Sequence, residues 1–153
     1  MSYEVVGFSA GWKKAPEVVR EQILRLQGEM LPIQCAMPEA VHHYAKGMYA
    51  REFSMPAGMT VVGKKHKHEH LMMVLKGHAK IATEFGNQEV KAGFIHVSQP
   101  GAKRVVYAIE DTTFVTVHLN PSDTTDIEQI EAEHIEPEAQ ETIDLAKRYK
   151  ELP

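Results

Sequence analysis

The segment from Met55 to Gly77 constrains the fold more than any other part of this 153-residue chain. It opens with the turn sequence Pro56-Ala57-Gly58 and closes with the apolar run 71–75. Three histidines stand at alternate positions between these ends: His66, His68 and His70. Alternate side chains of an extended chain point to one face, so the spacing predicts three imidazoles on one side of a strand. Imidazole is a common ligand for transition metals, so the cluster predicts a metal site, with solvated imidazoles at a polar strand end as the alternative.

Short strands separated by glycine and proline follow Gly47. The expected strands are Met48–Ser54, Thr60–Lys65, Leu71–Leu75, His78–Thr83, Gln88–Val90, Phe94–Ser98, Lys103–Ile109 and Thr113–Asn120. Tight turns are expected at 85–87 and 99–101, where glycine, asparagine and proline occur together. Many short strands at this spacing predict an antiparallel sandwich or barrel.

Helices are expected on either side of the strands. An amphipathic helix is predicted from Ala15 to Met30, followed by an irregular lead-in over 33–46. After the strands, helical turns are expected over Asp126–Ile130 and a helix over Glu136–Leu152. The chain therefore divides into an N-terminal helix and lead-in at 1–46, a β-barrel at 47–120 and an acidic helical tail at 121–153.

Composition excludes several classes of function. No apolar run approaches the roughly 20 residues that span a bilayer, and the N-terminus lacks the order of a signal peptide, so we expect a cytoplasmic protein without a membrane partner. The single cysteine, Cys35, rules out an intrachain disulfide. The body is only mildly positive, because ten acidic and three basic residues follow residue 120. It has no dense basic stripe for nucleic acid, but its charge favours a small anionic molecule, with an ordinary surface as the alternative.

Five features occur in the order of the two conserved motifs of the cupins: Pro56-Ala57-Gly58, the histidine cluster, Val74-Leu75-Lys76-Gly77, Gly93 and Gln99-Pro100-Gly101. The chain resembles this family over about residues 47–120. The resemblance implies a mainly β, cupin-type antiparallel jelly-roll barrel with the two helices packed outside, and it implies a homodimer. The stretch is also similar to small cupins of tailed bacteriophages, which would act in the host cytoplasm.

The resemblance also implies which residues replace the usual ligands. A cupin site uses two histidines one residue apart, a glutamate and a histidine on a later strand. In this chain the glutamate position falls on His70, the second histidine on His66 and the first on Lys64. A charged lysine cannot bind a metal. The later position falls on Lys103 or Arg104, so only His66 and His70 keep ligand chemistry.

Two alternatives complete the site. A shift in register would make His66 and His68 the pair, with His70 as the third ligand. Otherwise a ligand comes from outside the motifs, and His118 on the last strand is the best candidate, although it could equally be hydrogen-bonded in the barrel wall. The expected metal is zinc, iron, nickel or manganese. Three histidines are expected to lie outside the site: His78, His96 and His134.

Arg104 replaces the fourth ligand of the family. Its guanidinium is expected either to point into the barrel and bind an anion, as Lys103 beside it would, or to pair at the surface with Glu110 or Asp111. Two further residues lie on strands that are expected to line the cavity: Arg51 and Tyr107.

Two functions remain open. In the first, a small cupin holds a divalent metal ion through its histidines and binds or acts on a small, anionic molecule. In the second, the loss of two ligand positions leaves a non-catalytic ligand-binding or protein-interaction cupin. Because one fold supports many reactions, the sequence does not decide whether the protein is an enzyme.

Overall fold

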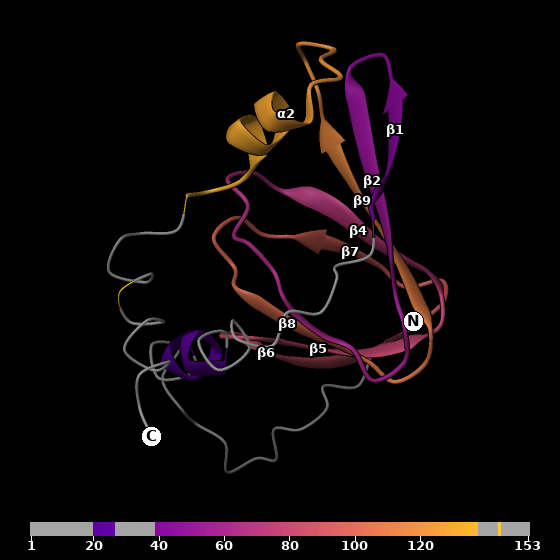
Figure 1. Cartoon of the computed structure of the whole chain (residues 1–153), viewed down its shortest axis with the longest axis vertical. Helices are drawn as coiled ribbons and strands as arrows, with labels where there is room; N and C mark the ends of the chain where they lie inside the picture. The colour runs from indigo at the N-terminus through magenta and orange to yellow at the C-terminus, as the bar shows by residue number, and fades with distance from the viewer. Residues whose placement is uncertain (1–19, 27–38, 138–143, 145–153) are drawn as a thin grey trace.

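Two antiparallel β-sheets form the body of the molecule in the computed structural model, which describes residues 20–26, 39–137 and 144 (Figure 1). The strand order is β1-β2-β9-β4-β7 in one sheet and β3-β8-β5-β6 in the other. The elements are β1 (Val41–Ala45), β2 (Met48–Met55), β3 (Thr60–Val62), β4 (His70–Lys76), β5 (His78–Thr83), β6 (Gly86–Lys91), β7 (Ile95–Ser98), β8 (Arg104–Ala108), β9 (Thr112–Leu119) and α2 (Ile127–His134). No strand pairing joins the two sheets among these strands, so the jelly roll is open rather than a closed barrel.

The central strand β9 sets which side chains face inward. It pairs with β2 over eight positions, from Met48 opposite Leu119 to Met55 opposite Thr112, and with β4 on its other side. Alternate residues of a strand share a face, and Phe114, Thr116 and His118 all line the cavity between the sheets. The sequence alone did not show which face of this strand points into the cavity. In the structure, His118 points inward.

Gly77 shows why a turn of the first motif needs glycine. Its φ is +92°, in the region that side chains rarely adopt. A Cβ atom here would collide with the backbone oxygen of Asp111 and lie 2.7 Å from the Cα of Thr112. The close approach of β4–β5 to the β8–β9 turn therefore depends on the missing side chain.

The hydrophobic core lies between the two sheets. It consists of Met55, Met72, Val74, Ala79, Ile81, Val90, Phe94, Ala108 and Phe114. The rings of Phe53 and Phe114 stack at 5.7 Å at the border between this core and the cavity.

The helices are described only in part. Residues 20–26 are helical, which agrees with the expected N-terminal helix, and the Arg20 guanidinium pairs with the Glu84 carboxylate at 2.7 Å. α2 extends beyond the expected turns, and the Asp126 carboxylate caps it by accepting the backbone N–H of Glu128 at 3.0 Å. The helix predicted over 136–152 falls almost wholly outside the described residues. No described helix is long and apolar enough to cross a membrane.

An irregular lead-in was expected before residue 47, but this part of the chain contains the strand β1. It pairs with β2 in register, with His42 opposite Arg51. His42 and His43 point to opposite faces, as neighbours on a strand must: His42 contacts the Tyr49 hydroxyl at 2.8 Å, and His43 pairs with Glu52 at 2.9 Å. β1 is an edge strand, and most of its residues are exposed, so it carries little hydrophobic pattern.

Candidate metal centre

Three histidines from separate parts of the chain meet at one end of the cavity. His66 follows β3, His70 begins β4, and His118 lies near the end of β9. One ring nitrogen of each lies within 4.8 Å of the others. The ring centroids are 4.1 Å apart for His66 and His70, 4.7 Å for His70 and His118, and 5.3 Å for His66 and His118.

Strand pairing and a bend explain this convergence. Leu71 lies opposite Val117, which brings His70 and His118 to the same end of neighbouring strands. The strand expected over 60–65 ends at residue 62, and residues 63–69 are not a regular strand. The bend folds His66 back beside His70, as a shared metal requires. It also overturns the expectation that alternate spacing puts all three imidazoles on one face, because His68 is exposed and outside the cluster.

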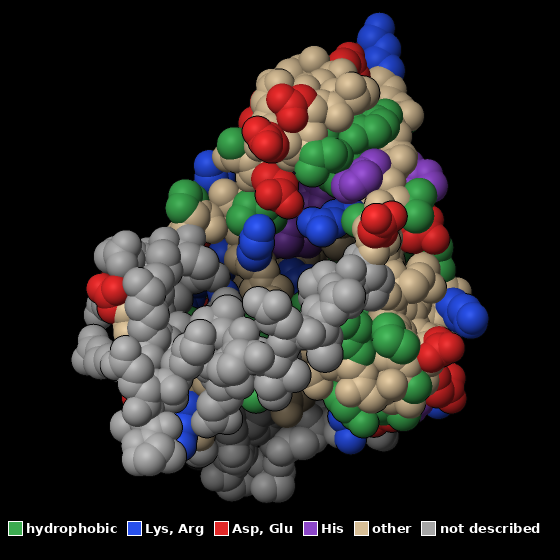
Figure 2. All heavy atoms as spheres, viewed as in Figure 1, with side chains coloured by type: hydrophobic (Ala, Val, Ile, Leu, Met, Phe, Trp, Pro, Cys, Tyr) green, Lys and Arg blue, Asp and Glu red, His purple; other side chains and the backbone are tan. Residues whose placement is uncertain are grey.

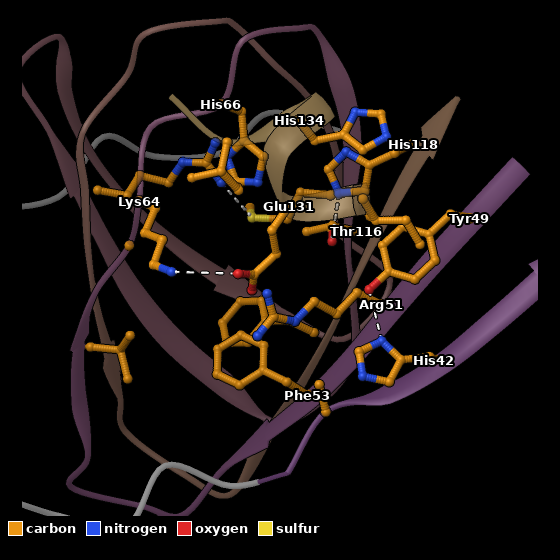
Figure 3. A pocket seen from close by; sticks show the side chains of 18 of the residues that line it. His42, Tyr49, Arg51, Phe53, Lys64, His66, Thr116, His118, Glu131 and His134 are labelled. Atoms are coloured by element: carbon orange, nitrogen blue, oxygen red, sulfur yellow. Dashed lines mark hydrogen bonds and ion pairs between the residues drawn. The ribbon is translucent and has the colours of Figure 1, made fainter. Parts of the chain in front are cut away.

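Hydrogen bonds determine which ring nitrogens of the cluster keep a lone pair that a metal could use. Nδ1 of His70 faces the backbone carbonyl oxygen of His68 at 3.4 Å. A carbonyl only accepts, so this nitrogen carries the proton and Nε2 keeps its lone pair. The Nε2 atom of His70 is buried and has no hydrogen-bond partner among the described residues. Nε2 of His118 contacts the Thr116 hydroxyl at 3.1 Å, which leaves Nδ1 available (Figure 3).

The three imidazoles are neutral at neutral pH. Burial, and then the neighbouring His70 and Arg104, lowers the pKa of His66 to about 3. Burial, and then Arg104, lowers the pKa of His70 to about 4. Burial, and then the other two histidines, lowers the pKa of His118 to about 3. Because protons do not compete for the lone pairs at pH 7, the donor set suits a divalent transition metal.

Two guanidinium groups lie beside the histidines. Arg104 points into the cavity, where its Nη1 lies 3.3 Å from the Met72 sulfur and its Nη2 donates to the Ser98 hydroxyl. It is therefore not the surface partner of Glu110 or Asp111 that the sequence left as an alternative. Arg51 also lines the cavity; it is partly open to solvent, and its guanidinium forms no hydrogen bond or ion pair within the described part of the chain.

The cavity has a volume of about 520 Å³. Figure 2 shows histidine and Lys or Arg side chains gathered around a hollow on this face of the molecule. The apolar walls of the cavity come from both sheets and from α2, and include Phe53, Val61, Val106, Phe114 and Ile130. Lys64 and Glu131 also line it, and their charged groups lie 4.0 Å apart (Figure 3). The cavity thus combines a histidine and guanidinium end with an apolar body.

Two of the expected ligand-binding residues do not reach the cavity. Lys103 is completely buried, and its backbone N–H donates to the Glu84 carboxylate at 3.1 Å. Tyr107 is exposed, because Arg104 and Val106 occupy the inward positions of β8 and their neighbours face outward. The cationic end of the cavity is therefore formed by Arg51, Arg104 and Lys64.

α2 contributes residues that the sequence reasoning missed. His134 was expected to lie outside the site, but it is buried and lines the cavity, as does Glu131. The helical spacing of Ile127, Ile130, Glu131 and His134 puts them on one face, but it does not indicate that this face covers the cavity. Tyr49 also lines the cavity, between the rings of His42 and His118, and burial raises its pKa.

No protein-family model and no curated protein matches the chain. Solved structures do. A double-stranded β-helix domain protein from Klebsiella pneumoniae is 18% identical over 60% of this chain and 84% of its own, with a TM-score of 0.50. A Cupin 2 conserved barrel domain protein from Salinispora arenicola is 14% identical over 63% of this chain and 85% of its own, with a TM-score of 0.48. A cupin-2 domain protein from Shewanella frigidimarina is 13% identical over 61% of this chain and 92% of its own, with a TM-score of 0.47. These likenesses concern the fold alone.

Proposed function

The chain has the cupin jelly-roll fold, and on this premise we propose that His66, His70 and His118 hold a divalent metal ion beside which a small anionic molecule binds. The observation that carries the proposal is the convergence of three neutral imidazoles, two buried and one half-buried, with nitrogens within 4.8 Å of one another. Such a cluster is costly to bury without a partner for its lone pairs. A metal ion supplies that partner.

The spacing of the rings supports a shared ion. Imidazole nitrogens bind zinc at about 2.0–2.1 Å, which puts the ring centroids of two ligands about 4.5–5.2 Å apart for angles between octahedral and tetrahedral. The observed separations, from 4.1 to 5.3 Å, bracket this range. Three protein ligands leave at least one open position, as in catalytic zinc sites. Zinc, iron, nickel and manganese all fit this donor set.

The anion is proposed from the charges of the cavity. Arg51 and Arg104 both lie close enough to the histidines to lower their pKa values, and Lys64 is matched by Glu131. Two guanidinium groups beside a divalent ion form a strongly positive end that favours a carboxylate or phosphate. Arg51 and Arg104 would orient the anion, and the apolar wall would exclude water. The metal would supply Lewis-acid chemistry toward a bound oxygen.

The test of the metal proposal is metal content measured by elemental analysis of the purified, untagged protein after incubation with zinc, iron, nickel or manganese. We expect about one ion per chain in the wild type and a large loss in His66→Ala, His70→Ala and His118→Ala. His43→Ala, which removes an exposed histidine of β1, is the matched control. Absence of uptake by the wild type would refute the metal proposal.

We further propose that the chain forms a homodimer through the outer face of the five-stranded sheet. Leu71 lies between Val97 of β7 and Val117 of β9, and Ile95 lies opposite Met73 one row along. Ile95 is 60% exposed, and Leu71 and Val97 are also exposed. Contiguous exposed apolar side chains of this kind support an interface between copies of the chain.

A further inference from the structure

His134, the last residue of α2, is a further buried histidine beside the centre. Only 7% of it is exposed, and neither ring nitrogen forms a hydrogen bond of good geometry among the described residues, although the backbone of Leu119 lies close enough to raise the pKa of the ring slightly against the effect of burial. Burying a polar group without a partner costs about 1–3 kcal/mol, so native proteins do so rarely. An imidazole with two unmatched nitrogens at the edge of a histidine cluster therefore calls for a ligand.

The position of His134 suits the ion held by the other three. Its ring centroid lies 5.1 Å from that of His118, within the range of about 4.5–5.2 Å expected for two imidazoles on one ion. It lines the same cavity as His66 and His118 (Figure 3). Burial lowers the pKa of His134, which keeps its ring neutral. Its nitrogens lie outside the 4.8 Å group formed by the other three histidines.

The backbone connects His134 to the triad formed by His66, His70 and His118. Ile135 forms an antiparallel bridge with His66. On either side of this bridge, the backbone N–H of Lys67 donates to the carbonyl of His134 at 2.9 Å, and the N–H of Glu136 donates to that of Lys65 at 2.9 Å. The end of α2 is therefore attached to the segment that carries one of the proposed ligands. A small inward movement of the last turn would bring the His134 ring to the ion without breaking the sheets.

We propose that His134 is the fourth protein ligand of the metal, supplied by α2 from outside the two sheets. It would replace the ligand that the barrel loses at Lys64 and Arg104. Four histidines leave an octahedral ion two open positions and a tetrahedral ion none, so an anion on the metal requires an octahedral ion. This inference rests on the proposed metal site.

The test uses Cu²⁺ as a spectroscopic probe and Zn²⁺ for affinity. The number of coordinated imidazoles is read from the nitrogen hyperfine structure in the EPR spectrum of the Cu²⁺ form. We expect four in the wild type and three in His134→Ala and His134→Gln. Zn²⁺ affinity, measured by competition with a chelator, should fall in both variants by at least about tenfold, the smallest loss usually seen when even a partner of a ligand is removed. His68→Ala is the matched control, because His68 is exposed and its ring lies edge-on to His134 at 6.1 Å.

The outcomes separate this inference from the proposed function. Three coordinated nitrogens in the wild type, or a Zn²⁺ affinity of His134→Ala within twofold of wild type, would overturn the role of His134 and leave the triad intact. Failure of the wild type to bind either metal would overturn both. Unfolding of the metal-free variants in urea checks that they are folded. The wild-type spectrum gives the ligand count even if a variant does not fold.

Discussion

Acid should destabilise the metal-free protein well before its carboxylates are protonated. His70 and His118 are 4% and 7% exposed, and their pKa values are about 4 and about 3, against an ordinary value of 6.5. Below pH 6.5 these two histidines therefore bind protons in the unfolded chain but stay neutral in the folded chain. The stability that the neutral rings provide is complete above pH 6.5 and is lost as the pH falls toward the folded values.

The expected size follows from proton linkage. Each histidine costs about 1.4 kcal/mol per pH unit between its unfolded and folded pKa values. From pH 7 to 5 the two most buried rings together should lower the free energy of unfolding by about 4 kcal/mol. This is a large part of the 5–15 kcal/mol typical of a domain. His66 is more exposed and is left out of the sum.

Urea unfolding of the chelator-treated protein at intervals from pH 7 to 5 measures this loss. Replacing His118 by Gln removes one of the two groups, so the slope of the unfolding free energy against pH should fall by about 1.4 kcal/mol per unit. His43→Gln, at an exposed position, should leave the slope unchanged. A free energy of unfolding that is constant over this range, or one whose slope is the same in His118→Gln, would refute the argument.

Four further outcomes are expected. Zn²⁺ at 100 times its dissociation constant should stabilise the wild type by about 2.7 kcal/mol in thermal or urea unfolding, and this gain should disappear in His118→Ala. Arg104→Met should weaken phosphate or acetate binding to the metal-loaded protein by about 10- to 100-fold in calorimetry, because a charged hydrogen bond is lost; unchanged binding would exclude Arg104 as an anion ligand. Met55→Ala, at a core position that is 1% exposed, should cost about 2–5 kcal/mol in urea unfolding. Val97→Lys should convert a dimer to a monomer in light scattering without loss of stability, and a wild-type monomer would exclude the dimer.

The strands were predictable because their signals are local. The strand expected over Met48–Ser54 is β2 (Met48–Met55), and the one over Thr113–Asn120 is β9 (Thr112–Leu119). Alternation of apolar side chains and turn glycines depends on neighbours in the sequence alone. β1 was missed because an edge strand with exposed residues has no such pattern.

The site was less predictable because it depends on contacts between distant segments. His66 and His70 stand out by spacing, but their meeting depends on a bend at 63–69, which also turns His68 away. His118 is inward because of the register of β9 against β2 and β4. His134 carries a helical pattern, but no local signal says that α2 lies over the cavity.

The replacement of a family ligand by Arg104 changes what the cavity needs. A histidine at this position would be a neutral donor to the metal, whereas a guanidinium adds a charge beside an ion that is already divalent. Lys64 pairs with Glu131 at 4.0 Å and Glu84 offsets part of the charge of Arg104, but the Arg51 guanidinium forms no ion pair within the described residues. Guanidinium groups beside a divalent ion repel it unless an anion lies between them, so metal and anion should each bind more tightly when the other is present. If the proposals above hold, the departures from the usual motif would not abolish the site, but would move one ligand to α2 and convert a metal-binding position into an anion-binding one.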